Sequence, residues 1–142
     1  MTIALVLVSH SELAAGMKAA TEFVAGPQDN FYAVGLKEAG IESYRLELQE
    51  LFLKLKKTVD SVIVISDIPA GSPGANALVV GQESQLMIEF VSGMNLALVL
   101  EFILTRETKS LDDLLKDGMD NARESIQQAQ LQVVSESGEE EF

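Results

Sequence analysis

Uncharged apolar runs alternate along this chain with segments in which apolar residues recur every three or four positions. The two most continuous runs are residues 2–9, "TIALVLVS", and residues 61–66, "SVIVIS". Runs of this kind are typical of strands that are buried on both faces, as in a parallel sheet. Two shorter runs, residues 31–36 and 86–91, predict further strands, and residues 131–134 are a candidate fifth strand.

The residues between these runs have the apolar spacing of helices. We expect helices at residues 13–24 and 44–55, from Ala75 to about Gly81, and at residues 96–104. Each shows apolar positions three or four apart, which places them on one face of a helix. Every expected helix therefore has a side that can pack on a sheet.

A last helix is expected after Ser110. This serine is a suitable N-cap residue, and Asp113 stands three positions on as the acidic partner of a capping box. The expected buried face of this helix consists of Leu111, Leu114, Leu115, Ala122 and Ile126.

The alternation of strands and helices predicts an α/β fold. We expect a three-layer sandwich with a mainly parallel four-stranded sheet, helices on both faces, and the candidate strand at its C-terminal end. A length of 142 residues suits one domain. We assign this domain to residues 1–134 and read residues 135–142, "SESGEEEF", as an acidic flexible tail.

The charge balance excludes one class of partner. The formal net charge is −12, which disfavours sequence-independent binding of nucleic acid. The chain has no cysteine and one histidine, so we expect neither disulfides nor a metal site. No apolar stretch reads as a membrane segment or a signal peptide, and we expect a cytoplasmic protein without direct membrane insertion.

Three polar stretches follow predicted strands. They are residues 9–11, 67–76 and 92–95. Open α/β sheets bind ligands beyond the carboxyl ends of their strands, and in a parallel sheet these ends share one edge. We therefore expect these stretches to meet there.

His10 and Asp67 are the residues best suited to chemistry at that edge. His10 is the only histidine and closes the first strand, where its imidazole is available as a nucleophile or a base. Asp67 directly follows "VIVIS", and a carboxylate there can fix the tautomer of an imidazole. The structural alternatives are a surface or capping histidine and a turn-capping aspartate.

The stretch "AGSPGANA", residues 70–77, resembles an anion-binding turn. Its glycines let backbone amides approach a ligand, the following helix start supplies further donors, and Ser72 adds a hydroxyl. Such a turn can cradle a phosphoryl group. It also fits an ordinary turn, and it is not a nucleotide P-loop, because no Gly-Lys-Ser/Thr follows.

Together these stretches resemble the IIA component of the mannose-type family of bacterial sugar phosphotransferase systems. The residues that carry the resemblance are "MTIALVLVSH", "VIVISDIPAGSPGANAL" and "VSGMNLALVLE", in family-like order over roughly residues 1–126. The chain departs from the family pattern at Ile68, Ala70, Gly74 and Ala97, where the family often has other residues.

The resemblance implies a function. His10 would accept a phosphoryl group from the phosphocarrier HPr and pass it to a histidine of the IIB component, with the membrane components involved only indirectly. Asp67 would hold the ring from Nδ1, and Gly71, Ser72 and Asn76 would bind the phosphoryl group. The resemblance further implies a homodimer that exchanges a C-terminal strand, and no cofactor.

Three other classes share parts of the pattern. The phosphoryl-donor subunit of the phosphotransferase-linked dihydroxyacetone kinase also begins with a strand that ends in "VSHS", but it lacks a stretch like residues 71–77. A receiver domain phosphorylated at Asp67 would need an acidic pair where this chain has Ser9 and His10. A flavodoxin-like binding module would use the same loops to hold a cofactor without catalysis.

Overall fold

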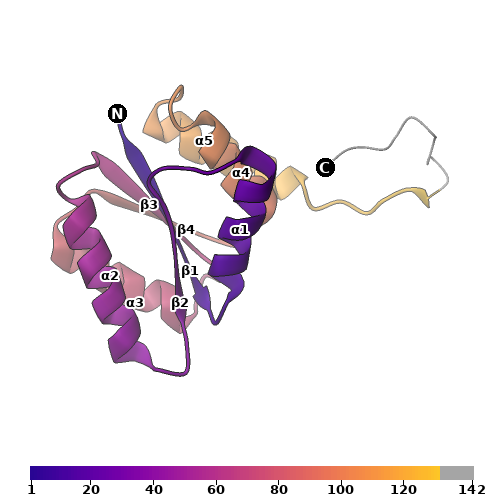
Figure 1. Cartoon of the computed structure of the whole chain (residues 1–142). Coiled ribbons are helices and arrows are strands. Elements are labelled where there is room, and N and C mark those ends of the chain that lie inside the picture. Colours follow the sequence, from indigo (N-terminus) through magenta and orange to yellow (C-terminus); the bar gives the residue numbers. More distant parts are fainter. Residues whose placement is uncertain (132–142) are drawn as a thin grey trace.

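Four parallel strands form the middle layer of the protein. The computed structural model describes residues 1–131 (Figure 1). The sheet has the order β2-β1-β3-β4 and consists of β1 (Ile3–His10), β2 (Phe31–Leu36), β3 (Ser61–Ser66) and β4 (Ile88–Ser92). All three strand pairings are parallel, which confirms the predicted sheet. The carboxyl ends of all four strands therefore lie at one edge.

Helices cover both faces of the sheet (Figure 1). One face packs against α1 (Leu13–Ala25), α4 (Leu96–Thr105) and α5 (Leu111–Glu124). The other face packs against α2 (Ile41–Leu55) and α3 (Ser72–Ser84). This arrangement is the predicted three-layer α/β sandwich.

Strand β1 contributes to both apolar cores. Leu5 and Leu7 pack with the α1, α4 and α5 layer, whereas Val6 and Val8 pack with the α2 and α3 layer. All four side chains are fully buried. Burying a side chain of this size stabilises the fold by about 1.5–3 kcal/mol, so a continuous apolar run suits this position. Strand β1 ends at His10.

Helix α3 begins earlier than the sequence predicted. We expected a loop through Asn76 and a helix from Ala75, but the helix begins at Ser72, with Gly71 as its extended N-cap residue. The glycine and proline content suggested a loop, yet proline is favoured in the first helical turn, where its missing N–H is not needed. Ser72 is therefore a first-turn helix residue.

The remaining element boundaries agree more closely. Strand β4 lies two residues later at its start and one later at its end than predicted. The expected N-cap of α5 is confirmed, because the Ser110 hydroxyl accepts a hydrogen bond of 3.2 Å from the Asp113 N–H. Leu114 and Ala122 are buried, and Leu111 and Leu115 pack beside them.

Ile126 is a wrong assignment. The spacing from Ala122 continues the apolar stripe, but α5 ends at Glu124 and Ile126 is 81% exposed. The Ser125 hydroxyl donates to the Ala122 carbonyl at 2.7 Å, which satisfies a terminal carbonyl and ends the helix.

The C-terminal predictions fall largely outside the described residues. Of the candidate strand at 131–134, only Leu131 is described, and it is 82% exposed. The rest of that strand and the acidic segment 135–142 lie beyond the described part. Up to Leu131, no helix combines the length and the apolar character that crossing a membrane requires.

Candidate functional site

The expected polar stretches meet at the carboxyl edge of the sheet. Asp67, after β3, is hydrogen-bonded to His10 at the end of β1. The backbone N–H groups of Gly93 and Met94, after β4, both donate to the Ser66 carbonyl at 3.1 Å. Parallel pairing thus brings residues from three separate loops to one place.

His10 and Asp67 form the centre of the site. One Asp67 oxygen, Oδ2, lies 2.7 Å from His10 Nδ1 and accepts a second hydrogen bond of 2.9 Å from the His10 backbone N–H. The Asp67 side chain is 8% exposed, whereas the His10 side chain is 53% exposed. The carboxylate is thus sheltered, and the ring that it holds is open to a partner.

The environment of Asp67 keeps its carboxyl group ionised. Burial alone would raise the pKa of Asp67, but hydrogen bonds from the His10 N–H, the His10 ring and the Ile68 N–H outweigh it and lower the pKa. An ionised carboxylate only accepts hydrogen bonds, so Nδ1 must carry the ring proton. In the neutral imidazole, the free lone pair then belongs to Nε2.

Two features of the turn after β1 hold His10 in place. The buried Ser9 hydroxyl accepts from the Ala14 N–H at 2.7 Å and donates to the His10 carbonyl at 3.0 Å. Ser11 adopts a left-handed conformation with φ of 49°, and its backbone N–H donates to the Leu36 carbonyl at 2.8 Å. A Cβ at Gly35 would clash with the Ser11 carbonyl oxygen, so no side chain fits there.

The N-terminus of α3 lies against the His10 ring. A Cβ at Gly71 would stand 2.9 Å from His10 Cε1, so this glycine permits close contact between the turn and the imidazole. No side chain caps α3, and Ser72 at its first position is exposed. The first N–H groups of a helix lack helical partners and favour an anion. The turn therefore offers uncapped donors and a hydroxyl near His10.

Asn76 lies one turn further along α3, and both ends of its side-chain amide are hydrogen-bonded. Its Nδ2 donates to the Ser72 carbonyl at 2.9 Å, and its Oδ1 accepts a hydrogen bond of 2.7 Å from Arg45 Nε. The Tyr44 hydroxyl donates to the Pro73 carbonyl at 2.6 Å. Sequence reasoning missed Tyr44 and Arg45, because α2 and α3 are separated in the chain and only the fold pairs them.

An open hollow of about 650 Å³ borders His10. It is lined also by Glu12, Leu36 and Lys37, among others. Lys37 Nζ lies 3.4 Å from a Glu12 carboxylate oxygen in an exposed ion pair. The hollow is broad enough for a protein surface to approach the ring.

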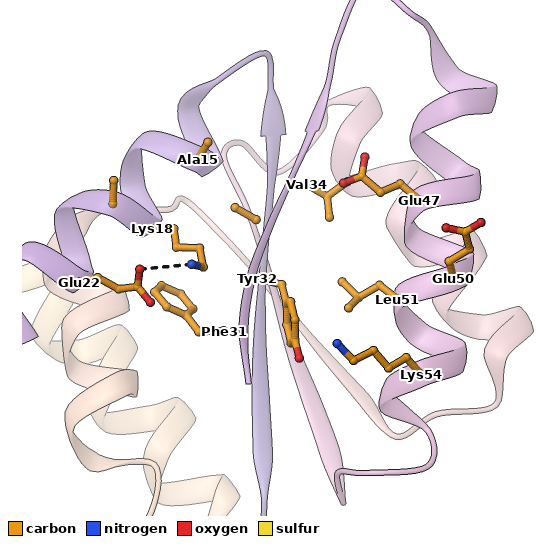
Figure 2. Close-up of a pocket in the computed structure, with 12 residues that line it drawn as sticks. Ala15, Lys18, Glu22, Phe31, Tyr32, Val34, Glu47, Glu50, Leu51 and Lys54 are labelled. Carbon is orange, nitrogen blue, oxygen red and sulfur yellow. Dashed lines mark hydrogen bonds and ion pairs between the residues drawn. The ribbon is translucent and has the colours of Figure 1, made fainter. Parts of the chain in front are cut away.

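A larger hollow, of about 800 Å³, lies along the β2 edge between α1 and α2 (Figure 2). Lys18 lies over the Phe31 ring at 5.7 Å and Lys54 over the Tyr32 ring at 5.2 Å. Lysines beside an edge strand discourage pairing with other chains. None of the predicted site residues lines this hollow, so it is separate from the His10 site.

Within residues 1–131, no cluster of three or more histidine, cysteine or acidic residues is arranged to hold a metal ion.

Comparison with known proteins agrees with this architecture. A family model described as "PTS system fructose IIA component" matches residues 4–119. The mannose-specific EIIAB component of the phosphotransferase system of Escherichia coli K12 is 28% identical over 134 residues, covering 89% of this chain. The chain spans 39% of the length of that relative.

Solved structures show the same fold. The phosphotransferase IIA protein associated with the fucose utilization operon of Streptococcus pneumoniae has a TM-score of 0.80 at 23% identity, covering 94% of this chain and 98% of its own. The mannose/sorbose-specific IIA subunit of Enterococcus faecalis has a TM-score of 0.79 at 22% identity, covering 95% and 100%. The chain belongs to the mannose-type family of phosphotransferase system IIA components.

Proposed function

We propose that this chain carries a phosphoryl group on Nε2 of His10, taking it from phosphorylated HPr and passing it to a histidine of a IIB component. The observation that carries the proposal is the contact of 2.7 Å between His10 Nδ1 and an Asp67 carboxylate that stays ionised. It leaves the Nε2 lone pair as the nucleophile of a half-exposed ring.

The chemistry balances without a net proton change on His10. The Nε2 lone pair forms a bond to phosphorus while the bond from phosphorus to the donor imidazole breaks, and its electron pair returns to the donor ring. The phosphorylated His10 ring keeps its Nδ1 proton and becomes cationic, and Asp67 stabilises that charge. In the transfer to the IIB histidine, His10 is the donor: the bond from Nε2 to phosphorus breaks, its electron pair returns to the His10 ring, and the IIB imidazole forms the new bond.

The first turn of α3 is proposed to bind the phosphoryl oxygens. Phosphoryl transfer depends mainly on placement and on stabilisation of spread negative charge. The uncapped N–H groups that follow Gly71 and the exposed Ser72 hydroxyl suit this role. Asn76 lies one turn further along α3, and because both ends of its amide are bonded we assign it to holding Ser72.

Several wider features belong to the same proposal. We propose one domain over residues 1–134, an acidic tail at 135–142, a homodimer and a cytoplasmic location. The membrane components are proposed to bind the sugar, so this chain would not touch it. The open hollow beside His10 supports a carrier that docks two protein partners in turn.

Intact-mass measurement tests the proposal. The wild type, incubated with phosphoenolpyruvate, enzyme I and HPr, should gain one acid-labile phosphoryl group, and His10→Ala should gain none while retaining its fold. Labelled wild type is then mixed with a IIB component or with the dihydroxyacetone kinase. Transfer to the kinase alone would overturn the proposal, as would labelling of His10→Ala.

A further inference from the structure

Two consecutive residues of α2 hold two consecutive carbonyls in the first turn of α3. The buried Tyr44 hydroxyl donates to the Pro73 carbonyl at 2.6 Å. Arg45 reaches the Ser72 carbonyl through Asn76, with hydrogen bonds of 2.7 Å and 2.9 Å. Helix α2 thus holds the first turn of α3, which begins beside the His10 ring at Gly71.

These side-chain hydrogen bonds are additional to the backbone hydrogen bonds of the helix. Carbonyls in the first turn of an α-helix already accept from the N–H four residues on, which for Ser72 and Pro73 are those of Asn76 and Ala77. A carbonyl oxygen has a second lone pair, and here the side chains of Tyr44 and Asn76 use it. The extra bonds therefore fix and polarise the turn rather than satisfy it.

Polarisation acts on a specific donor. The Pro73 carbonyl belongs to the same peptide group as the Gly74 N–H, which is a first-turn donor of α3. Hydrogen bonds in series strengthen one another, so the bond from Tyr44 makes that N–H a better donor. Gly74 itself packs against β3, since a Cβ there would lie 3.1 Å from Ser66 Oγ.

The ionisation states of Tyr44 and Arg45 are consistent with this role. Burial raises the pKa of Tyr44, and the nearby negative charge of Asp67 raises it further, so the phenol stays a donor at neutral pH. Arg45 adds a permanent positive charge behind the turn. This positive charge favours an anion at the α3 turn, where Gly71 lies against the His10 ring.

We infer that Tyr44 and Arg45 are positioning residues for phosphoryl transfer, because they clamp and polarise the α3 turn that faces His10. This inference rests on the proposed function and names the residues that tune the same site. Neither residue touches the reacting atoms, and Arg45 acts through Asn76 and Ser72.

The test compares Tyr44→Phe and Arg45→Met with matched controls. Tyr32→Phe removes the hydroxyl of the other tyrosine in the chain, and Lys54→Met removes a different cation from α2. For each protein we would measure the rate of phosphoryl transfer from HPr, the lifetime of phosphorylated His10, and the melting temperature.

We expect Tyr44→Phe and Arg45→Met each to slow transfer by about tenfold and to shift the Gly74 amide resonance in the phosphorylated protein. Both controls should match the wild type. Wild-type rate and lifetime in both variants would overturn the inference, even if their melting temperatures fell, because that pattern is purely structural. Because Arg45 is only half-buried, we expect Arg45→Met to fold. The test therefore stays decisive even if Tyr44→Phe fails to fold. Failure of the wild type itself to become labelled would instead overturn the proposed function.

Discussion

A single oxygen of Asp67 accepts two hydrogen bonds from His10, one from the ring Nδ1 at 2.7 Å and one from the backbone N–H at 2.9 Å. The carboxylate thereby fixes both the position of the residue and the orientation of its ring. The second oxygen accepts from the Ile68 N–H at 3.0 Å, which holds the carboxylate in turn. Ring orientation in this site is therefore a property of the β3 end as much as of β1.

Removing that carboxylate should slow transfer while sparing docking. In Asp67→Ala the ring loses its fixed tautomer and the stabilisation of its cationic form, and we expect transfer from HPr to fall by about 100-fold or more. Single-turnover transfer kinetics and a binding titration with HPr check this separately. Transfer at the wild-type rate would contradict the role assigned to Asp67.

Acid should remove the stability that Asp67 supplies. The pKa of Asp67 is lower in the folded protein than its ordinary value, so the folded state binds protons less readily. The ionised Asp67 carboxylate contributes its full share to the free energy of unfolding above the unfolded-state pKa of about 3.9. This share is lost as the pH falls through the folded-state pKa. The measurement is urea unfolding of wild type and Asp67→Asn from about pH 6 to about pH 2.5. Their difference in unfolding free energy should shrink with acid, and a constant difference would refute this.

A methyl group at Gly71 should disturb the ring. Its Cβ would lie 2.9 Å from His10 Cε1, so either the imidazole or the α3 turn must shift. We expect Gly71→Ala to slow transfer by about tenfold or more. The control is Gly16→Ala, where nothing lies within 4 Å. Gly16→Ala should leave transfer unchanged and stabilise α1 by about 0.5–1 kcal/mol. Equal transfer rates in Gly71→Ala and Gly16→Ala would show that the close contact between Gly71 and His10 is not needed.

Arg106 should be a large contributor to stability at the opposite edge of the sheet. It is 7% exposed and donates to the backbone carbonyls of Ile3, Asn30 and Asp29. Arg106→Met leaves those carbonyls without this donor, and we expect a loss of about 2–4 kcal/mol in the free energy of unfolding.

The matched control for that change is Arg123→Met. Arg123 lies in an exposed ion pair with Asp120 at 3.5 Å, and its loss should change the free energy of unfolding by less than about 0.5 kcal/mol. Urea denaturation measures both. Similar effects of the two substitutions would contradict the assigned role of Arg106.

The sequence predicted the sheet because its central strands are buried on both faces. The apolar runs that end at Ser9 and Ser66 have few other structural solutions, and parallel topology then places His10 and Asp67 at one edge. The sequence alone therefore predicts that these two residues lie near each other.

The sequence did not predict what supports the site. Tyr44 and Pro73 are 29 positions apart, and Arg45 and Asn76 are 31 apart, so only helix packing pairs them. Arg106 reads as an ordinary surface cation, and its carbonyl partners lie 76 to 103 positions away. Apolar periodicity identifies buried faces but carries no register between helices, and local composition alone did not place the start of α3 at Ser72.

The most direct test of the account is the nitrogen NMR spectrum of the imidazole in the phosphorylated protein. Because His10 is the only histidine, isotope-labelled histidine gives signals from one ring alone. We predict that phosphorylation by HPr shifts the Nε2 resonance while Nδ1 keeps its proton and its contact with Asp67. A phosphoryl group on Nδ1, or an unchanged ring in a protein that has gained the mass of one phosphoryl group, would contradict the account.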